Sequence, residues 1–565
     1  MRNCGTGSAL SRRKTSSIRS STARRALRYA AELRFPRDTS KAERNRRVDE
    51  VLAELSLTPH AETRTDRLSG GQQKRVNVAL ELMTKPSLLF LDEPTSGLDP
   101  GLDKSVMEMM SGLAKDGRTV IVVTHSVANL DICDRLLVLV PGGKVAYFGP
   151  PQDGLKHFGK PGWAEVFQAF DAEPDRDWAG EYRRSAWHQQ YVMAESDGRG
   201  HVAPQRQAPP PPTSKNRLAQ FSTLCRRYLA VIASDRVYLA LLAGAPIVLG
   251  LVILAIPANY GLGPAPPPKA HPTAQPTGHA SKHPGGQASH HASSHPSPQA
   301  VASQSAGHAT PSAHASVHAS GHASAHASGR ATATGHAAQT VAVNDAASSL
   351  LLILVICACF AGAFNAVREL VKERSIYGRE RAAGLSTASY LGSKLTVLGL
   401  ISGLQAGIMV LIGLFGRKLP TSGSLLHGFP LVELIIALAL LAVVSMALGL
   451  FISASVNTSE KTMPILMVVV VVEVILTGGV FAIAGKVGLE QVAWLSPSRW
   501  GYALTASTSN LNEIFPPTPG NPVDHLWDHT GRQWLMNMVA LAALGAIFAA
   551  LAWWRLVRQG PARRG

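Results

Sequence analysis

The sequence predicts two unlike domains: an α/β domain near the N-terminus and, after it, an all-α domain of six membrane-spanning helices. Two observations carry this prediction. An apolar run at 87–94 ends in two acidic residues, which is typical of a buried strand that delivers carboxylates to its C-terminal tip. Six later runs are apolar over the roughly 20 residues that a helix needs to cross a bilayer.

Composition narrows the class of protein further. The chain has 565 residues and a net charge of +17. Its Lys and Arg residues lie largely beside apolar segments, which favours contact with a membrane surface over contact with nucleic acid. The five cysteines indicate no disulfide framework, because two of them lie inside an apolar run. The N-terminus has no apolar segment of the signal-peptide kind, so we expect it in the cytoplasm.

Basic residues near the ends of the six runs predict their orientation. Three clusters fall on one side of the membrane, and the positive-inside rule makes that side cytoplasmic, with both chain ends inside. The predicted spans are 237–257, 347–367, 395–415, 431–452, 463–485 and 535–554. The clusters are Arg226, Arg227 and Arg236; Arg368, Lys372, Arg374, Arg379 and Arg381; and Arg555, Arg558, Arg563 and Arg564.

Three features of the membrane half could carry function. Segment 365–386 is too polar to span and too regular for a loop, which predicts a cytoplasmic helix that docks on the other domain, the alternative being a solvated connector. Glu473 lies mid-span, where a carboxylate is costly, and is either structural or in contact with a substrate. Segment 261–340 is rich in Ala, Ser, Pro and His, which predicts a disordered external loop, with metal capture by its histidines as an alternative.

The N-terminal half contains residues suited to ATP chemistry. At the end of the 87–94 strand, Asp92 would hold Mg²⁺ and Glu93 would act as the general base on the attacking water. The stretch LSGGQ at 68–72 exposes glycine N–H groups ahead of a helix predicted at 74–83, which makes an anion site. A second buried strand at 118–126 ends at His125, a γ-phosphate sensor or, alternatively, a structural histidine.

These motifs together resemble the ATP-binding cassette (ABC) transporter family. The signature motif, the Walker B strand, the D-loop and the switch histidine follow in the family's order, over residues 24–157. The resemblance implies that ATP and Mg²⁺ are cofactors and that Asp99 contacts a second cassette. It implies that His125 contacts the γ-phosphate, and that the signature motif binds the partner's γ-phosphate. The signature residues are Ser69, Gly70, Gly71 and Gln72.

The cassette-then-membrane order and the stretch VRELVKERSIYGRERAAGLS look like the G (White-like) subfamily of half-transporters. The bacterial members related to ABC transporters with forkhead-associated domains look most similar, and segment 486–534 lacks the cysteines typical of eukaryotic members. This resemblance implies an exporter subunit that forms a homodimer or a heterodimer with another half-transporter in the inner membrane. It implies a transported substrate that the sequence does not identify, and no nucleic acid partner.

The Walker A motif, G-x-x-x-x-G-K-[ST], is absent from the sequence, as is a recognisable Q-loop glutamine. Its only Lys-Thr pair, Lys14-Thr15, follows Arg13 rather than Gly. Residues 11–21 could be encoded by nucleotides that, read one base earlier, give VPQEDILHPQL, which resembles the family's Q-loop. We therefore interpret 1–22 as an atypical, frameshifted N-terminus, with coincidence through codon degeneracy as the alternative.

The predicted fold is thus a partial α/β P-loop-type nucleotide-binding domain lacking Walker A, followed by the six-helix transmembrane domain. The domains are 23–157 for the partial cassette, 158–235 for a linker and 236–558 for the membrane part. The competing interpretation is a catalytically inactive subunit, either one that offers only its signature motif to an intact cassette or the remnant of a broken gene. A third interpretation is a metal-scavenging surface protein. The six apolar runs exclude a soluble ATPase.

Overall fold

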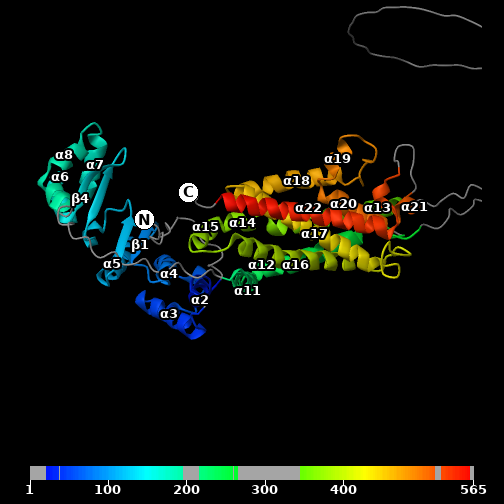
Figure 1. Ribbon diagram of the computed structural model, residues 1–565, viewed down its shortest axis with the longest axis horizontal. Helices are drawn as coiled ribbons and strands as arrows, with labels where there is room; N and C mark the ends of the chain where they lie inside the picture. The colour runs from blue at the N-terminus through cyan, green and yellow to red at the C-terminus, as the bar shows by residue number, and fades with distance from the viewer. Residues whose placement is uncertain are drawn as a thin grey trace, which may run out of the picture. The chain divides into compact units, whose positions relative to one another are not determined.

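The computed structural model describes residues 21–36, 38–194, 216–258, 260–264, 344–515 and 523–559 (Figure 1). Residues 265–340 of the predicted His-rich segment 261–340 and residues 1–20 of the atypical N-terminus lie outside these ranges. The described chain has an α/β part up to residue 194 and a helical part after residue 216, as the sequence predicts.

The α/β part is built around two parallel strands. β1 (Leu88–Asp92) pairs with β2 (Thr119–Val123), with Asp92 opposite Val123. One face of this pair packs into a core of apolar side chains from the surrounding helices. Those helices are α2 (Ala23–Arg34), α3 (Lys41–Glu54), α4 (Gly70–Leu82) and α5 (Pro100–Lys115).

The opposite face of the β1–β2 pair is exposed. The side chains of Phe90, Ile121 and Val123 are 39%, 39% and 56% exposed. Among the described residues, β2 has no partner on its other edge. Parallel sheets are normally covered on both faces, so this surface has the character of an interior.

A second small core follows, around the antiparallel pair β3 (Leu136–Val140) and β4 (Lys144–Gly149). Tyr147, Phe158, Trp163, Phe170 and Trp178 fill it. Its helices lie partly within 158–235, the segment that the sequence assigns to a linker, because aromatic side chains there bury themselves against β4. The helices are α6 (Pro151–Phe158), α7 (Trp163–Ala172), α8 (Trp178–Arg184) and α9 (Ala186–His188).

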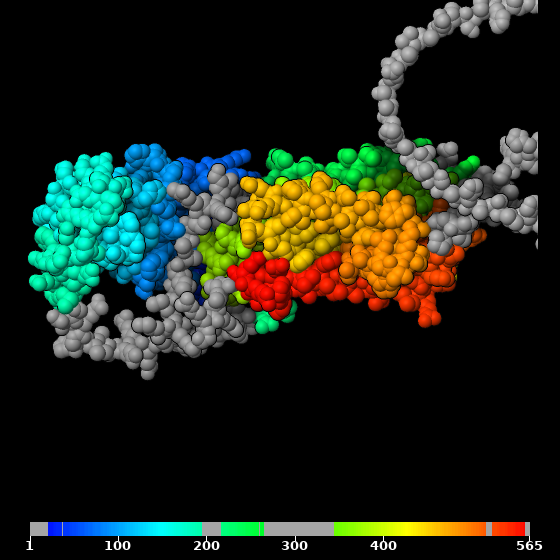
Figure 2. Space-filling view, turned by 90° about the horizontal axis from the view of Figure 1, so that it is seen from above, coloured from blue at the N-terminus to red at the C-terminus, as the bar shows by residue number. Residues whose placement is uncertain are grey.

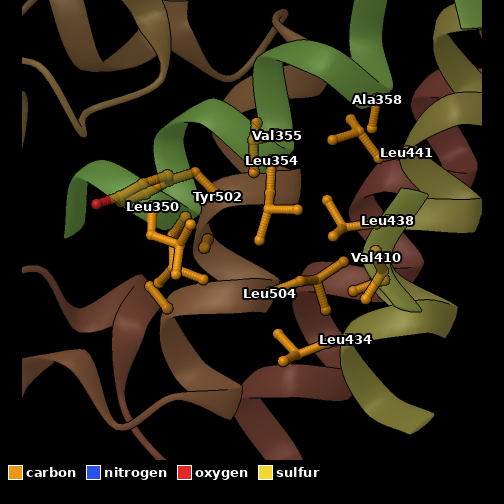
Figure 3. Packing of buried hydrophobic residues seen from close by; sticks show 14 of the residues in the cluster. Leu350, Leu354, Val355, Ala358, Val410, Leu434, Leu438, Leu441, Tyr502 and Leu504 are labelled. Atoms are coloured by element: carbon orange, nitrogen blue, oxygen red, sulfur yellow. The ribbon is translucent and has the colours of Figure 1, made fainter. Parts of the chain in front are cut away.

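The helical part contains, among the described residues, five helices long and apolar enough to cross a membrane. α17 lies among the others and packs against α13, α16, α20 and α22. Figure 3 shows Leu350 and Leu354 of α13 directed toward Leu438 of α17 and Leu504 of α20. The five helices are α12 (Arg236–Ala255), α13 (Asp345–Ala366) continuing through α14 (Glu369–Lys372), α16 (Thr387–Gly413), α17 (Pro430–Ser455) and α22 (Gly531–Arg558).

The span predicted at 463–485, the fifth of the six, is not confirmed. It corresponds to α18 (Thr462–Leu476), whose 15 residues rise about 22 Å, short of a hydrocarbon core of ~30 Å. Gly478, with φ of 83°, takes a backbone conformation that ends the helix. The chain then continues through α19 (Leu489–Ala493) and α20 (Pro497–Thr508). Segment 462–476 lies at the surface of the helical part in Figure 2, and Val468 and Val471 of α18 are exposed.

Glycines allow the two most closely packed helices to touch. A Cβ on Gly362 of α13 would lie 2.1 Å from the carbonyl oxygen of Ala442 on α17. A Cβ on Gly449 of α17 would lie 2.5 Å from the carbonyl oxygen of Ala363 on α13. No side chain fits at either position, so the backbones themselves set the α13–α17 distance.

Buried polar groups fix α20 within the bundle. The carboxylate of Glu473 accepts hydrogen bonds from the Ser496 hydroxyl, at 2.8 Å, and from the Ser498 N–H, at 2.9 Å. A carboxylate at a helix N-terminus is stabilised by the free N–H groups there. Glu473 thus caps α20. This favours a structural role for Glu473 over contact with a substrate. Buried Arg499 pairs with Asp524 at 2.6 Å.

Candidate functional site

The predicted catalytic residues come together at one end of the β1–β2 pair. Because the strands are parallel and in register, their carboxyl ends lie at the same edge. The Glu93 N–H donates to the Val123 carbonyl at 2.8 Å, so the pairing continues one residue beyond β1. Asp92, Glu93 and His125 therefore occupy one edge of the sheet, as the sequence predicts.

Glu93 and His125 are in direct contact. The His125 Nδ1 lies 2.5 Å from Oε1 of Glu93. The Glu93 backbone has φ of 52°, a left-handed conformation that costs a non-glycine residue of order 1–3 kcal/mol. The Lys74 ammonium donates to the Glu93 carbonyl at 3.3 Å, which helps hold that conformation. A carboxylate and an imidazole in this arrangement can position a water and accept its proton.

Asp92 has the properties of a metal ligand. Its side chain is half-buried, and within the described ranges its carboxylate has no hydrogen bond or ion pair. Hard carboxylate oxygens are the protein ligands that Mg²⁺ prefers, so the residue present fits that ion. Nearby, buried Asp103 accepts a hydrogen bond from the Ser126 hydroxyl at 3.1 Å, which anchors the segment after His125 to α5.

The signature residues form the start of α4. Ser69 and Gln72 make a reciprocal capping box: the Ser69 hydroxyl accepts from the Gln72 N–H at 3.3 Å, and the Gln72 Oε1 accepts from the Ser69 N–H at 3.0 Å. The Gln72 Nε2 also lies 2.9 Å from the His60 Nε2. The Gln72 side chain therefore orients the helix start.

The two glycines next to this cap lie close to leucine side chains. A Cβ on Gly70 would lie 3.1 Å from the Leu98 side chain, and a Cβ on Gly71 would lie 3.2 Å from the Leu102 side chain. Asp99 caps α5, since its Oδ1 accepts from the Leu102 N–H at 3.0 Å. The signature segment and the segment around Asp99 thus support each other within one chain.

Contacts link this region to the membrane helices, and no motif in the sequence identifies them. Glu81, near the end of α4, lies between Arg34 of α2 and Arg379 of α15 (Arg374–Ala382), 3.5 Å from each. Glu32 of α2 accepts hydrogen bonds from Thr223 and Arg226 of α11 (Arg217–Ser234), at 3.1 and 2.9 Å. The predicted helix at 365–386 is thus helical in part, as α14 and α15, and contacts the cassette.

Comparison with known proteins agrees with this arrangement. A family model described as "ABC transporter" matches residues 6–96, and one described as "ABC-2 family transporter protein" matches residues 303–554. The chain belongs to the ABC transporter family and joins a cassette segment and an ABC-2 type membrane domain in one polypeptide.

Among relatives, the chain is 36% identical over 544 residues to the ABC transporter ATP-binding/permease protein Rv1747 of Mycobacterium tuberculosis, a match that covers 95% of this chain and 52% of that protein. The chain therefore spans about half the length of this relative. Over its cassette it is also 36% identical, over 149 residues, to the broad substrate specificity transporter ABCG2 of Bos taurus, covering 25% of this chain and 23% of that protein.

Proposed function

We propose that the chain is the cassette-and-permease subunit of a dimeric, ATP-driven exporter in a bacterial inner membrane, with the cassette and both chain ends in the cytoplasm. The contact between Glu93 and His125 at the strand ends carries this proposal, because it supports a water-activating base beside an unengaged carboxylate, Asp92. The homology of the whole described chain to cassette–permease proteins supports it as well.

In this mechanism the residues act on a bound nucleotide from two chains. Asp92 would hold Mg²⁺, which neutralises phosphate charge when bound. Glu93 accepts a proton from the water whose oxygen attacks the terminal phosphorus, while the bond from that phosphorus to the ADP oxygen breaks. His125 holds the Glu93 carboxylate and contacts the γ-phosphate. The partner's copies of Ser69, Gly70, Gly71 and Gln72 close the site, and Asp99 lies at the contact between cassettes.

The link to transport runs along α4. Its first residues belong to the nucleotide site, and Glu81, near its last residue, contacts Arg379 of α15. A displacement of the signature residues is therefore passed to the helices that precede α16 through one rigid element of 13 residues. Energetic coupling between sites can be carried by packed side chains, ion pairs and rigid helices of this kind, and it is measured by mutation.

A second candidate function is a non-catalytic subunit that offers its signature motif to an intact cassette. The exposed face of Phe90, Ile121 and Val123 and the open edge of β2 favour it, since a further strand with a phosphate-binding loop would complete this sheet. The absence of a Walker A motif from the sequence favours it as well. Such a strand could come from another polypeptide.

Phosphate release distinguishes the two functions. Three purified samples are compared: the chain alone, the chain joined to or co-expressed with a segment that carries a Walker A motif, and that completed protein with Glu93→Gln. We expect no turnover in the first, turnover in the second and its loss in the third, because an amide holds the water but cannot accept its proton. Hydrolysis by the chain alone would show that the sequence contains an unrecognised phosphate site. Turnover that survives Glu93→Gln would assign catalysis to the other cassette.

A further inference from the structure

A cavity of about 440 Å³ lies among three membrane helices, α12, α13 and α16. Its size falls in the range of small-molecule sites, ~300–1,000 Å³. The lining is mostly apolar and includes Leu249, Phe360, Phe364 and Met409. α18 contributes no residue to the lining.

The side-chain amides of Asn365 and Gln405, which line the cavity, donate hydrogen bonds to groups of the protein. The Asn365 amide donates to Gln405 at 2.6 Å and to Ser402 at 3.0 Å. The Gln405 amide donates to the Leu242 carbonyl at 2.7 Å. That carbonyl would normally bond the N–H of residue 246, which is Pro246 and has none. Because these amides already donate to groups of the protein and the rest of the lining is mostly apolar, the cavity favours an apolar occupant.

The cavity is open toward the side of the bundle. Leu241 and Val248 on α12 and Phe364 on α13 line it and remain exposed. Along α12 its lining runs from Leu241 to Leu249, about 12 Å of helix. In a membrane such a recess faces lipid, so the hydrocarbon chain of a lipid fits both its chemistry and its opening.

Cations lie at the cassette-side end of the cavity. Arg368 follows Phe364 by one helical turn, and Arg236 begins α12. Both are exposed, and neither side chain has an ion pair or hydrogen bond among the described residues. Asp235 lies beside Arg236 but bonds the Tyr238 N–H and caps α12. Arginine binds phosphate in two-pronged hydrogen bonds, so Arg368 suits an anionic headgroup at this depth.

We propose that this cavity holds one acyl chain of an anionic phospholipid from the cassette-side leaflet, with the headgroup phosphate bound by Arg368 and Arg236. The lipid would be a resident ligand that supports the kinked helix α12. This proposal does not depend on ATP hydrolysis. It depends only on the membrane placement of α12, α13 and α16.

The test is native mass spectrometry of the delipidated full chain in mixed micelles of phosphatidylglycerol and phosphatidylcholine. We expect one phosphatidylglycerol per chain. Arg368→Ala should weaken its retention about five-fold relative to phosphatidylcholine, the usual effect of one cation near a membrane surface. Arg555→Ala, at the end of α22 away from the cavity, serves as the matched control and should change nothing.

A second pair of variants tests the cavity itself. Ala361→Trp fills it and should abolish retention of either lipid, whereas Leu400→Trp, on the exposed face of α16, should not. Equal retention of both lipids by the unmodified chain would overturn the headgroup assignment. Retention unchanged by Ala361→Trp would overturn the cavity assignment. Arg368→Ala lies on the surface, so its result stands even if Ala361→Trp fails to fold.

Discussion

Residue chemistry in the cassette is partly legible from sequence. Asp92, Glu93 and His125 could be grouped in advance because residues that follow parallel strands share one edge. The left-handed backbone of Glu93 could not, since it arises where the strand pairing with Val123 continues into a turn. The Ser69–Gln72 capping box carries a readable signal, a Ser followed three residues later by a Gln. From the sequence, these residues were interpreted only as an anion site, and the capping box was not predicted.

A further residue with a distinctive environment is His157. Its ring stacks on Tyr147, with centroids 5.8 Å apart, and meets the edge of Phe158 at 4.8 Å. Burial lowers the pKa of His157, and the charge of Glu181 only partly opposes this effect. The folded chain thus favours the neutral imidazole.

The lowered pKa of His157 predicts an acid-sensitive cassette. An unfolded histidine has a pKa near ~6.5. As pH falls below about that value, the unfolded chain binds a proton that the folded chain rejects, so stability falls until the lower folded pKa is passed. His157→Phe keeps ring contacts and removes the titration. Its melting temperature should therefore fall less between pH 7.5 and 5.5 than that of the unmodified chain. Parallel pH profiles would contradict the prediction.

At the scale of elements, the sequence predicts helices and strands well and their ends poorly. The runs at 431–452 and 535–554 correspond to α17 and α22, which extend beyond both limits because polar first and last turns also form helix. α18 shows the converse: its apolar run continues to 485, but Gly478 and Gly479 interrupt the helix. The close α13–α17 crossing depends on Gly362 of α13 and Gly449 of α17, each of which lies against the backbone of the other helix. These glycines are 87 residues apart in the sequence, so local pattern does not reveal that they pack in the same contact.

The contact between α4 and α15 predicts energetic coupling between the cassette and the membrane helices. Glu81 and Arg379 are both nearly buried, 12% exposed each, so removal of one partner leaves a poorly solvated charge. In a double-mutant cycle of Glu81→Gln and Arg379→Gln, we expect a coupling energy of about 1 kcal/mol or more in thermal unfolding of the purified chain.

A matched pair calibrates this cycle. Arg176 and Glu181 form a comparable ion pair at 2.8 Å, but both side chains are substantially exposed. Their cycle should give at most ~1 kcal/mol and a value below that of Glu81 and Arg379. If the two cycles agree, the α4–α15 contact does not hold the domains together.

For the whole molecule, the order of the two domains was predictable from the sequence, and the exposed face of the β1–β2 pair was not. Motif order fixes a cassette followed by a permease, and the family matches confirm both parts. The exposed apolar face of Phe90 and Ile121 was not predictable, because the covering of a sheet face is decided by tertiary packing and not by local pattern.

Orientation in the membrane is a prediction at the same scale, and it requires the chain to cross the membrane once between the end of α17 and the start of α22, through α18 and the segment after it. Val487, 95% exposed in the segment between α18 and α20, should lie outside the cell, and exposed Ser375 of α15 should lie in the cytoplasm. In a chain without its native cysteines, Val487→Cys should react with a membrane-impermeant maleimide in intact cells. Ser375→Cys should react only after permeabilisation. The reverse pattern would invert the proposed topology.

The hydrogen bond from Gln405 to the Leu242 carbonyl also has a consequence in time. α12 leaves the ribosome more than 130 residues before α16. Until α16 arrives, the carbonyl freed by Pro246 has no backbone donor in its own helix, and an unpaired carbonyl is expensive in hydrocarbon. A side chain of the third membrane helix, α16, therefore satisfies a backbone carbonyl of the first, α12. Before α16 is made, we expect water or a local change of the backbone to satisfy this carbonyl.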